Sequence, residues 1–339
     1  MSDAPSARRR VGASARRVLI AHRLAPAIAE GIAAARPDLE LRPKQLQEVT
    51  QEDLAWADTL VGFKRPPGLG KVTWVHSIGA GVDGFLSAVP SSRRSAGWPK
   101  GVLLTRASEP FGPQMGEYVA ARVLAVCQHL SRFAGDQQAR RWAPFTPRRA
   151  AGTRAVVVGT GEVGTGIAAA LARLGVEVTG VSRSGGPIQP SSHPAFQPSG
   201  QPFAFIHAAG DLPGLVPHAD WIVLAAPLTR ETRGMVGKKL LDRCRGAWLI
   251  NVARGGLVDE PALLEALDEG RLGGAALDVF EKEPLPKRSR LWKHPKVILS
   301  PHVAGVTTVE GAVAGFLECL ESLERGETPR WAVDPGRGY

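Results

Sequence analysis

Three charged side chains in the last third of the chain are of the types that an acid–base site needs. Arg254, Glu283 and His302 each follow a short apolar run typical of a buried strand. If these runs are parallel strands of one sheet, the three side chains lie beyond carboxyl ends, where such sheets bind ligands. A cation, a carboxylate and an imidazole that converge there can orient an anion and move a proton. Each residue alone has an ordinary structural explanation, but the combination favours a catalytic site.

A glycine pattern in the middle of the chain predicts a dinucleotide site. Gly159, Gly161 and Gly164 form G-x-G-x-x-G directly after the apolar run 155–158 and before an alanine-rich helical stretch. The first glycine permits a tight turn, the second lets backbone N–H groups approach a pyrophosphate, and the third lets the helix pack on the strand. This context favours a nucleotide-binding unit over a glycine-rich turn without a ligand.

The residues after the second strand of this unit indicate which dinucleotide binds. A carboxylate there would bond the ribose 2′-hydroxyl of NAD, whereas arginine accommodates a 2′-phosphate. This chain has Ser182, Arg183 and Ser184 at that position, with no acid between Glu177 and Asp211. A guanidinium flanked by two hydroxyls suits a phosphate. We therefore predict that NADP(H) is preferred and that NAD(H) is possible, with an ordinary exposed loop arginine as the alternative.

The elements that must position these residues form two β-α series. The first has strand-like runs at 17–21, 59–61, 72–76 and 102–104, with a helix over 24–35; the second has runs at 155–158, 176–181, 221–224, 247–250, 275–279 and 297–300. A helical pattern over 117–133 and a Pro/Arg-rich joint at 142–154 separate the two series, and a Pro/Ser/Gly-rich surface insertion spans 184–201. Asp259 and Gly270 predict the two ends of a further helix. Alternating strands and helices predict an α/β fold with two doubly wound parallel-sheet domains, Rossmann-like and flavodoxin-like.

Composition limits the class of protein. The 339 residues are 44% hydrophobic, enough for about two domains with buried cores. We expect a soluble cytoplasmic protein with neither a membrane span nor a metal site, because no apolar run is long enough to span a bilayer and the three cysteines are scattered. Of the net charge of +10, residues 1–17 carry five arginines and one acid. These residues predict a disordered basic tail, with targeting or anion binding as alternatives, and no specific nucleic-acid partner.

Several motifs, in this order, resemble the D-isomer-specific 2-hydroxyacid dehydrogenases. The resemblance rests on Ser77-Ile78-Gly79-Ala80-Gly81-Val82-Asp83, Met115-Gly116-Glu117-Tyr118-Val119, the glycine pattern, Pro227-Leu228-Thr229 with Thr232, Asn251 to Gly255, Leu277 to Pro286 and Pro301-His302. Gln114 to Tyr118, together with Val181 to Ser184, is most similar to the glyoxylate and hydroxypyruvate reductase branch.

The resemblance implies a role for each site residue. His302 would be the general acid, Glu283 would stabilise its imidazolium, and Arg254 would hold the substrate together with the Ala80 and Gly81 backbone. Asp278 would bond the nicotinamide carboxamide. The residues implied to line the rest of the cofactor site are Glu162, Val163, Ala226, Pro227, Thr232, Val252 and Ala253.

The resemblance also implies an assembly. A dinucleotide-binding domain over 119–305 would be inserted into a discontinuous substrate-binding domain of 18–118 plus 306–339, with an active-site cleft between them. Two copies would form a homodimer through the cofactor domain, using the helix from Glu117 and the stretch 137–154.

Three functions fit these features. The first is an NAD(P)H-dependent reductase of small 2-keto acids to D-2-hydroxy acids. The second is an NAD(P)H-sensing binding protein, similar to the corepressors that share this fold. The third is formate or phosphite oxidation; the formate-oxidising branch has glutamine as the partner of the histidine, so Glu283 argues against it. Which 2-keto acid is preferred stays open, because no diagnostic motif marks the side-chain pocket.

Overall fold

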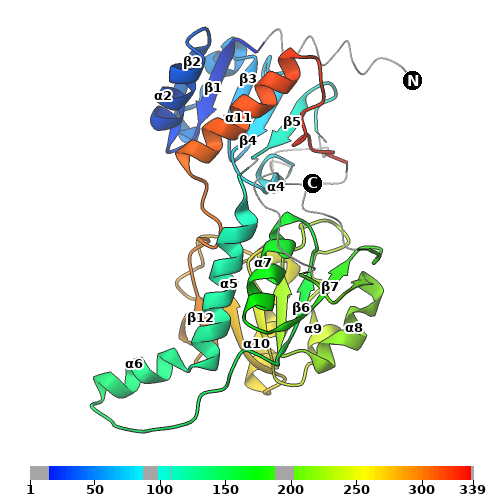
Figure 1. The fold of residues 1–339 in the computed structure, drawn as a ribbon. Coiled ribbons are helices and arrows are strands. Elements are labelled where there is room, and N and C mark those ends of the chain that lie inside the picture. The colour runs from blue at the N-terminus through cyan, green and yellow to red at the C-terminus, as the bar shows by residue number, and fades with distance from the viewer. Residues whose placement is uncertain (1–14, 87–97, 108, 188–201, 337–339) are drawn as a thin grey trace. The chain divides into compact units, whose positions relative to one another are not determined.

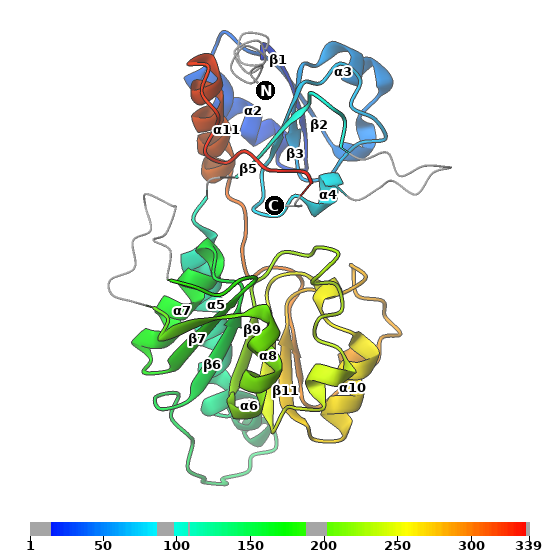
Figure 2. The ribbon, with the colours of Figure 1, turned by 90° about the vertical axis from the view of Figure 1, so that its right-hand side faces the viewer.

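The computed structural model describes residues 15–86, 98–107, 109–187 and 202–336. The chain divides into two compact units, one of residues 1–109 and 307–339 and the other of residues 110–306. Each unit is a parallel α/β sheet with helices on both faces, as the sequence predicts (Figures 1 and 2).

In its described part, the first unit has five parallel strands in the order β2-β1-β3-β4-β5. The strands are β1 (Arg17–Ala21), β2 (Glu40–Lys44), β3 (Thr59–Gly62), β4 (Trp74–Ser77) and β5 (Leu103–Arg106), and the helices are α2 (Ala25–Ala35), α3 (Gln51–Trp56), α4 (Asp83–Leu86) and α11 (Val309–Glu324). Figure 2 shows α2 and α11 on one side of this sheet and α3 on the other.

Alternation along β1 builds two cores in this unit. Val18 and Ile20 pack into a cluster with α2 and α11, whereas Leu19 and Ala21 pack into a second cluster with Leu54 of α3. Successive side chains of a strand point to opposite faces, so a strand buried on both faces has a continuous apolar sequence. The run Val18-Leu19-Ile20-Ala21 therefore belongs in a sheet that helices cover on both sides.

In its described part, the second unit has seven parallel strands in the order β12-β11-β10-β9-β6-β7-β8. The strands are β6 (Arg154–Val158), β7 (Glu177–Ser182), β8 (Phe205–Ala208), β9 (Trp221–Leu224), β10 (Ala247–Asn251), β11 (Leu272–Leu277) and β12 (Val297–Leu299). The helices are α5 (Phe111–Cys127), α6 (Leu130–Gln138), α7 (Glu162–Arg173), α8 (Leu212–Leu215), α9 (Lys238–Leu241) and α10 (Glu260–Asp268). Short 3-10 turns lie at Leu46–Glu48 in the first unit and at Ala209–Asp211, Val216–His218, Gly255–Leu257 and Arg290–Lys293 in the second.

Small residues let two helices of the second unit touch. A Cβ atom on Gly116 of α5 would lie 2.8 Å from the carbonyl oxygen of Gly166 in α7, and one on Gly166 would lie 2.3 Å from the backbone of Gly112. Larger side chains would force α5 away from the helix that follows the glycine pattern. The predicted ends of α10 are confirmed, because Asp259 accepts the Ala262 N–H at 3.1 Å and Gly270 has a φ of 76°.

Several predicted boundaries were wrong. The helix predicted over 117–133 begins at Phe111 and ends at Cys127, because His129 adopts a left-handed φ of 54° before α6. Strands β2 and β8 were not predicted. The second compact unit, residues 110–306, extends beyond the predicted domain of 119–305 at its amino end.

The predicted tail of residues 1–17 is also too long. Ala15 is buried, the Arg16 N–H donates to Asp58, and Arg17 begins β1. Residues 1–14, and 188–201 of the predicted insertion, lie outside the described residues.

Candidate functional site

The glycine turn after β6 lies where the strand order of the second sheet reverses, between β6 and β9. Gly159 has a φ of 103°, and a Cβ there would lie 2.6 Å from the Ala225 backbone after β9. A Cβ on Gly164 would lie 1.8 Å from the carbonyl oxygen of Gly159, whereas one on Gly161 would meet nothing within 4 Å. Two glycines therefore close the turn, and the third leaves open space at the start of α7.

The amino end of α7 suits an anion. Among the described residues, no side chain caps this helix, so the first-turn N–H groups remain available beside Gly161. Such groups and the helix dipole favour a phosphate. The open space and these donors fit the pyrophosphate of a dinucleotide.

Asn251 shapes the loop that carries Arg254. Its side-chain amide donates to the Arg254 carbonyl at 3.0 Å, and its amide oxygen accepts the Ala253 N–H at 3.1 Å. A Cβ on Gly255 would lie 1.8 Å from the Phe280 backbone, so the loops after β10 and β11 touch. No role was predicted for the Asn251 side chain from the sequence, although an amide at a strand end often bonds its own loop.

His302 and Glu283 are brought together. The Nδ1 atom of His302 lies 2.7 Å from Oε2 of Glu283, and the two side chains are 37% and 35% exposed. Nδ1 donates in this bond when Glu283 is ionised, which leaves Nε2 directed away from the carboxylate. His302 has a left-handed φ of 56°, rare for a residue with a side chain, and its N–H donates to the Asp278 carbonyl at 2.8 Å.

Opposing effects set the charge of Glu283. Partial burial raises its pKa. The hydrogen bonds from His302 and the Phe280 N–H, together with the charges of His302 and Arg254, lower the pKa by more than burial raises it. The net pKa is below the ordinary value. Glu283 is therefore a carboxylate at neutral pH, and it interacts with both basic residues of the predicted site.

Asp278 organises the loop around His302. Its carboxylate is buried and accepts three hydrogen bonds, from the Ser300 hydroxyl at 2.6 Å, the Val303 N–H at 2.9 Å and the Ala304 N–H at 2.8 Å. Ser300 also contacts the Tyr118 hydroxyl. These bonds hold both flanks of His302, a task that the sequence did not reveal for Asp278 or Ser300.

Some residues predicted to line the cofactor site have other contacts. The Glu162 carboxylate accepts the Gly112 N–H at 2.9 Å, and Val163 packs on the core. The Thr232 hydroxyl donates to the Pro227 carbonyl at 2.7 Å and so closes the turn after β9. The remaining predicted lining residues, all mostly buried at strand ends, are Ala226, Val252 and Ala253.

Arg183 is exposed at the end of β7, next to Ser182 and Ser184. The structure adds an acid that the sequence analysis missed. The pKa of Glu231 is lowered first by a hydrogen bond from Thr229, and also by the charges of Arg230 and Arg183. Glu231 lies 48 positions after Arg183, so no local pattern could have linked the two.

Ala80 and Gly81 belong to the other unit and lie in the turn after β4. The buried Ser77 hydroxyl lies 3.2 Å from the carbonyl oxygens of both Gly79 and Gly81 and can donate its proton to either. Ser77 thus fixes the shape of the loop that was predicted to bind a carboxylate.

Neither a metal-binding group nor a membrane-spanning helix is found in the part of the chain that the structure describes. No group of three or more His, Cys, Asp or Glu side chains there could hold a metal ion. Within the same residues, no helix has the length and apolar character to cross a membrane.

The chain is similar to known proteins over most of its length. The profile "D-isomer specific 2-hydroxyacid dehydrogenase, NAD binding domain" matches residues 120–304. Glyoxylate/hydroxypyruvate reductase A of Serratia proteamaculans (strain 568) is 33% identical over 285 residues, which cover 81% of this chain and 86% of that protein.

Solved structures of the same family are similar to this chain. A D-isomer specific 2-hydroxyacid dehydrogenase from Xanthobacter autotrophicus Py2, in complex with NADPH and MES, is 31% identical with a TM-score of 0.81, covering 96% of this chain and 100% of that one. The NADPH-dependent glyoxylate/hydroxypyruvate reductase from Sinorhizobium meliloti, in complex with NADP and sulfate, is 28% identical with a TM-score of 0.81 and the same two coverages. The chain belongs to the D-isomer-specific 2-hydroxyacid dehydrogenase family and is an NAD(P)-dependent oxidoreductase.

Proposed function

We propose that this protein reduces small 2-keto acids, of the glyoxylate and hydroxypyruvate type, to D-2-hydroxy acids with NADPH. The observation that carries the proposal is the 2.7 Å contact between His302 and Glu283, with Arg254 interacting with the same carboxylate. A cofactor-sensing protein would need no such acid–base pair, and the comparisons do not support that alternative.

His302 is the proton donor in this proposal. With Glu283 bonded to Nδ1, the Nε2 proton is the one available to a keto oxygen. Positioned acid catalysis of this kind contributes about 10²- to 10⁴-fold to rate. When bound, the reduced nicotinamide supplies the hydride. Glu283 fixes the orientation of the ring and stabilises its charged form.

Arg254 and the Ala80-Gly81 loop are the proposed substrate-binding groups. The forked guanidinium of Arg254 can bond the substrate carboxylate and keto oxygen together, which a single lysine could not. Backbone N–H groups of the loop that Ser77 shapes would bond the carboxylate.

A panel of substrates tests the reaction. Glyoxylate, hydroxypyruvate, pyruvate, phenylpyruvate and 2-ketoisocaproate are assayed against NADPH and NADH. We expect turnover with the smallest acids, and His302→Gln should lower kcat by at least about 100-fold. The matched control is His294→Gln, because His294 also pairs with a carboxylate of this unit, Asp268 at 3.3 Å. No turnover of any substrate, or equal activity of the two variants, contradicts the proposal.

Arg183 carries the proposed preference for NADPH, and two solved relatives in complex with NADPH or NADP support it. One charge-assisted hydrogen bond is worth about 1.5–3 kcal/mol, or about 10- to 100-fold in kcat/KM. Arg183→Ala should raise the KM for NADPH by about that factor and barely change the KM for NADH. The control is Arg288→Ala, another exposed arginine of this unit. If Arg183→Ala weakens both cofactors alike, the assignment fails.

We further propose a homodimer formed through α5, α6 and the segment after them. Large apolar side chains are exposed there: Leu124 (39%), Leu130 (54%), Phe133 (44%) and Trp142 (95%). Such a patch is typical of a surface that a second copy covers. Sedimentation should give a dimer at micromolar concentration, and Trp142→Ser should weaken it. A wild-type monomer would refute the proposal.

A further inference from the structure

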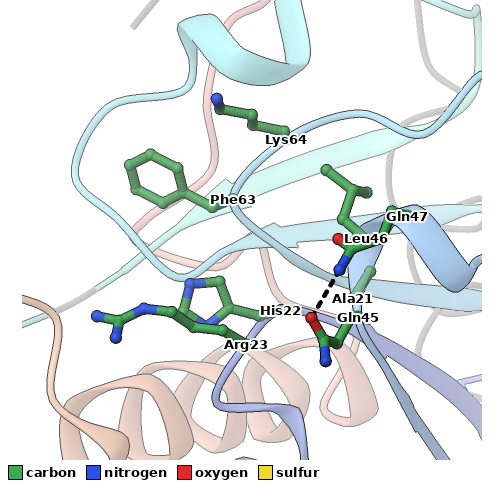
Figure 3. Close-up of a pocket in the computed structure, with 8 residues that line it drawn as sticks. All are labelled: Ala21, His22, Arg23, Gln45, Leu46, Gln47, Phe63 and Lys64. Atoms are coloured by element: carbon green, nitrogen blue, oxygen red, sulfur yellow. Dashed lines mark hydrogen bonds between the residues drawn. The ribbon is translucent and has the colours of Figure 1, made fainter. Parts of the chain in front are cut away.

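A pocket lies in the first unit, at the carboxyl ends of its strands. It has a volume of about 210 Å³ and is lined by Ala21, His22, Arg23, Gln45, Leu46, Gln47, Phe63 and Lys64. These residues end or directly follow β1, β2 and β3 (Figure 3). Pockets for drug-sized ligands are usually about 300–1,000 Å³, so this one suits a group of only a few atoms.

The strand order places this pocket at a ligand-binding position. In the order β2-β1-β3-β4-β5, the direction of winding reverses between β1 and β3. Ligands of doubly wound sheets bind outside the carboxyl ends at such a reversal. His22 and Arg23 follow β1, and Phe63 and Lys64 follow β3, so the lining comes from both sides of the reversal.

The lining is basic. His22, Arg23 and Lys64 are its ionisable side chains, and the described lining contains no acid. Glu48, just beyond it, accepts the Gln45 N–H at 3.0 Å. Figure 3 shows the Phe63 ring between the guanidinium of Arg23 and the ammonium group of Lys64. A lining with two cations and no acid favours an anion over a cation.

His22 adds a neutral donor. Burial, and then the charge of Arg23, lower its pKa, so the ring is neutral at pH 7. Its Nδ1 atom accepts the Leu24 N–H at 3.3 Å, which leaves the ring proton on Nε2. An Nε2–H group donates to an anionic oxygen as readily as an amide does.

Two side chains of the pocket lining pack against the predicted substrate loop. A Cβ on Gly79 would lie 2.3 Å from the Phe63 ring, and one on Gly84 would lie 3.2 Å from Cγ of Lys64. Phe63 and Lys64 therefore pack directly on the glycine-rich turn that contains Ala80 and Gly81. Phe63 and Lys64 are therefore the part of the pocket lining that lies next to the turn predicted to hold the substrate carboxylate.

We propose that this pocket binds a carboxylate or phosphate group of a small organic acid, and that this group is the end of the substrate remote from its keto acid. The inference rests on the proposed function and adds a substrate class, 2-keto acids with a second anionic group. A free anion such as inorganic phosphate has the same chemistry, and the experiment below separates the two sources.

Paired substrates test the proposal with the full chain and NADPH. Oxaloacetate and 2-oxobutanoate, and likewise 2-oxoglutarate and 2-oxopentanoate, differ only in a terminal carboxylate or methyl group. We expect the wild-type kcat/KM to be higher for the dicarboxylic acid than for its methyl partner in at least one pair. Lys64→Met should lower this ratio of the two kcat/KM values by about 10-fold. This is the low end for a charge-assisted bond, because Lys64 is exposed. The ratio within a pair cancels any general loss of activity. Lys71→Met, another exposed lysine of this unit, should leave the ratio unchanged.

Calorimetry with phosphate and with succinate gives the second readout. If both bind the wild type and bind Lys64→Met about 10-fold more weakly, while the substrate ratios do not change, the pocket binds a free anion and the assignment to substrate is wrong. If Lys64→Met and Lys71→Met have the same substrate ratios and bind phosphate and succinate equally well, the anion site itself is refuted. Should no keto acid be reduced at all, the proposed function fails, and the binding of phosphate and succinate still decides whether the pocket is an anion site.

Discussion

Replacing Asp278 with asparagine should reduce both stability and turnover, through the loop that holds His302. The carboxylate accepts two donors at Oδ1, Ser300 and Val303, and one at Oδ2, Ala304. An asparagine has only one acceptor oxygen, so its NH₂ group must face at least one of these donors. A buried donor without an acceptor costs about 1–3 kcal/mol, and the remaining bonds lose their charge assistance.

The expected loss of stability is therefore about 2–4 kcal/mol. Part of it falls on the conformation of His302, whose left-handed backbone costs on the order of 1–2 kcal/mol and persists because its neighbours are fixed. If about 2 kcal/mol of positioning is lost, kcat/KM with glyoxylate falls about 30-fold.

Three measurements test this reasoning: urea unfolding, kcat/KM, and the Kd of NADPH from fluorescence. The control is Asp220→Asn, because the Asp220 carboxylate also accepts a backbone N–H, that of Arg154 at 2.9 Å, at the amino end of the same sheet. We expect Asp278→Asn to lower kcat much more than it raises the Kd of NADPH. Wild-type kcat/KM in this variant, or a loss matched entirely by a weaker Kd, would refute the positioning role and favour direct contact with the nicotinamide.

Glu283→Gln should lower kcat with glyoxylate by about 10-fold, because the His302 ring loses the carboxylate that orients it; wild-type kcat in this variant would contradict the assigned pair. Burial lowers the pKa of His76 to about 3. As the pH falls below about 6.5, the His76 ring therefore takes up a proton in the unfolded state but stays neutral in the folded state. Between pH 7 and pH 5, the free energy of unfolding of the wild type should fall by about 2 kcal/mol because of this group. In urea unfolding, the fall for His76→Gln should be smaller by that amount; equal falls would be inconsistent with a neutral buried ring. Glu231→Gln should raise the preference for NADPH over NADH by less than about fivefold, and only at low salt, because Glu231 interacts with the Arg183 charge; an effect that persists in high salt would exclude this cause.

Much of the fold was predictable because most strands are buried on both faces. Runs such as Val18 to Ala21 have no polar residue, and only a covered parallel sheet accommodates them. The two missed strands are edge strands that lack this signal. β2 has the sequence Glu-Leu-Arg-Pro-Lys, and in β8 Phe205 is 69% exposed. Edge strands carry charge and proline to prevent further pairing, and these residues make them resemble loops.

The candidate site was predictable in its residue types but not in its supporting contacts. Strand ends and the resemblance together marked Arg254, Glu283 and His302. The bonds that hold their loops come from residues far apart in sequence, such as Asp278 to Ala304, and from Asn251, whose bond partners depend on a loop conformation that no periodicity encodes. Sequence patterns report burial and local turns, whereas these contacts depend on which strand ends lie side by side.

The order of the strands, more than any single motif, determines where each sheet can bind a ligand. The seven-stranded sheet reverses between β6 and β9, and the five-stranded sheet between β1 and β3. At the first reversal, Gly161 and the uncapped start of α7 leave room and N–H donors for a pyrophosphate. At the second, Arg23 and Lys64 surround a space too small for a nucleotide. The two units therefore share one topological rule, and the side chains after their strands decide that one binds a dinucleotide and the other a small anion.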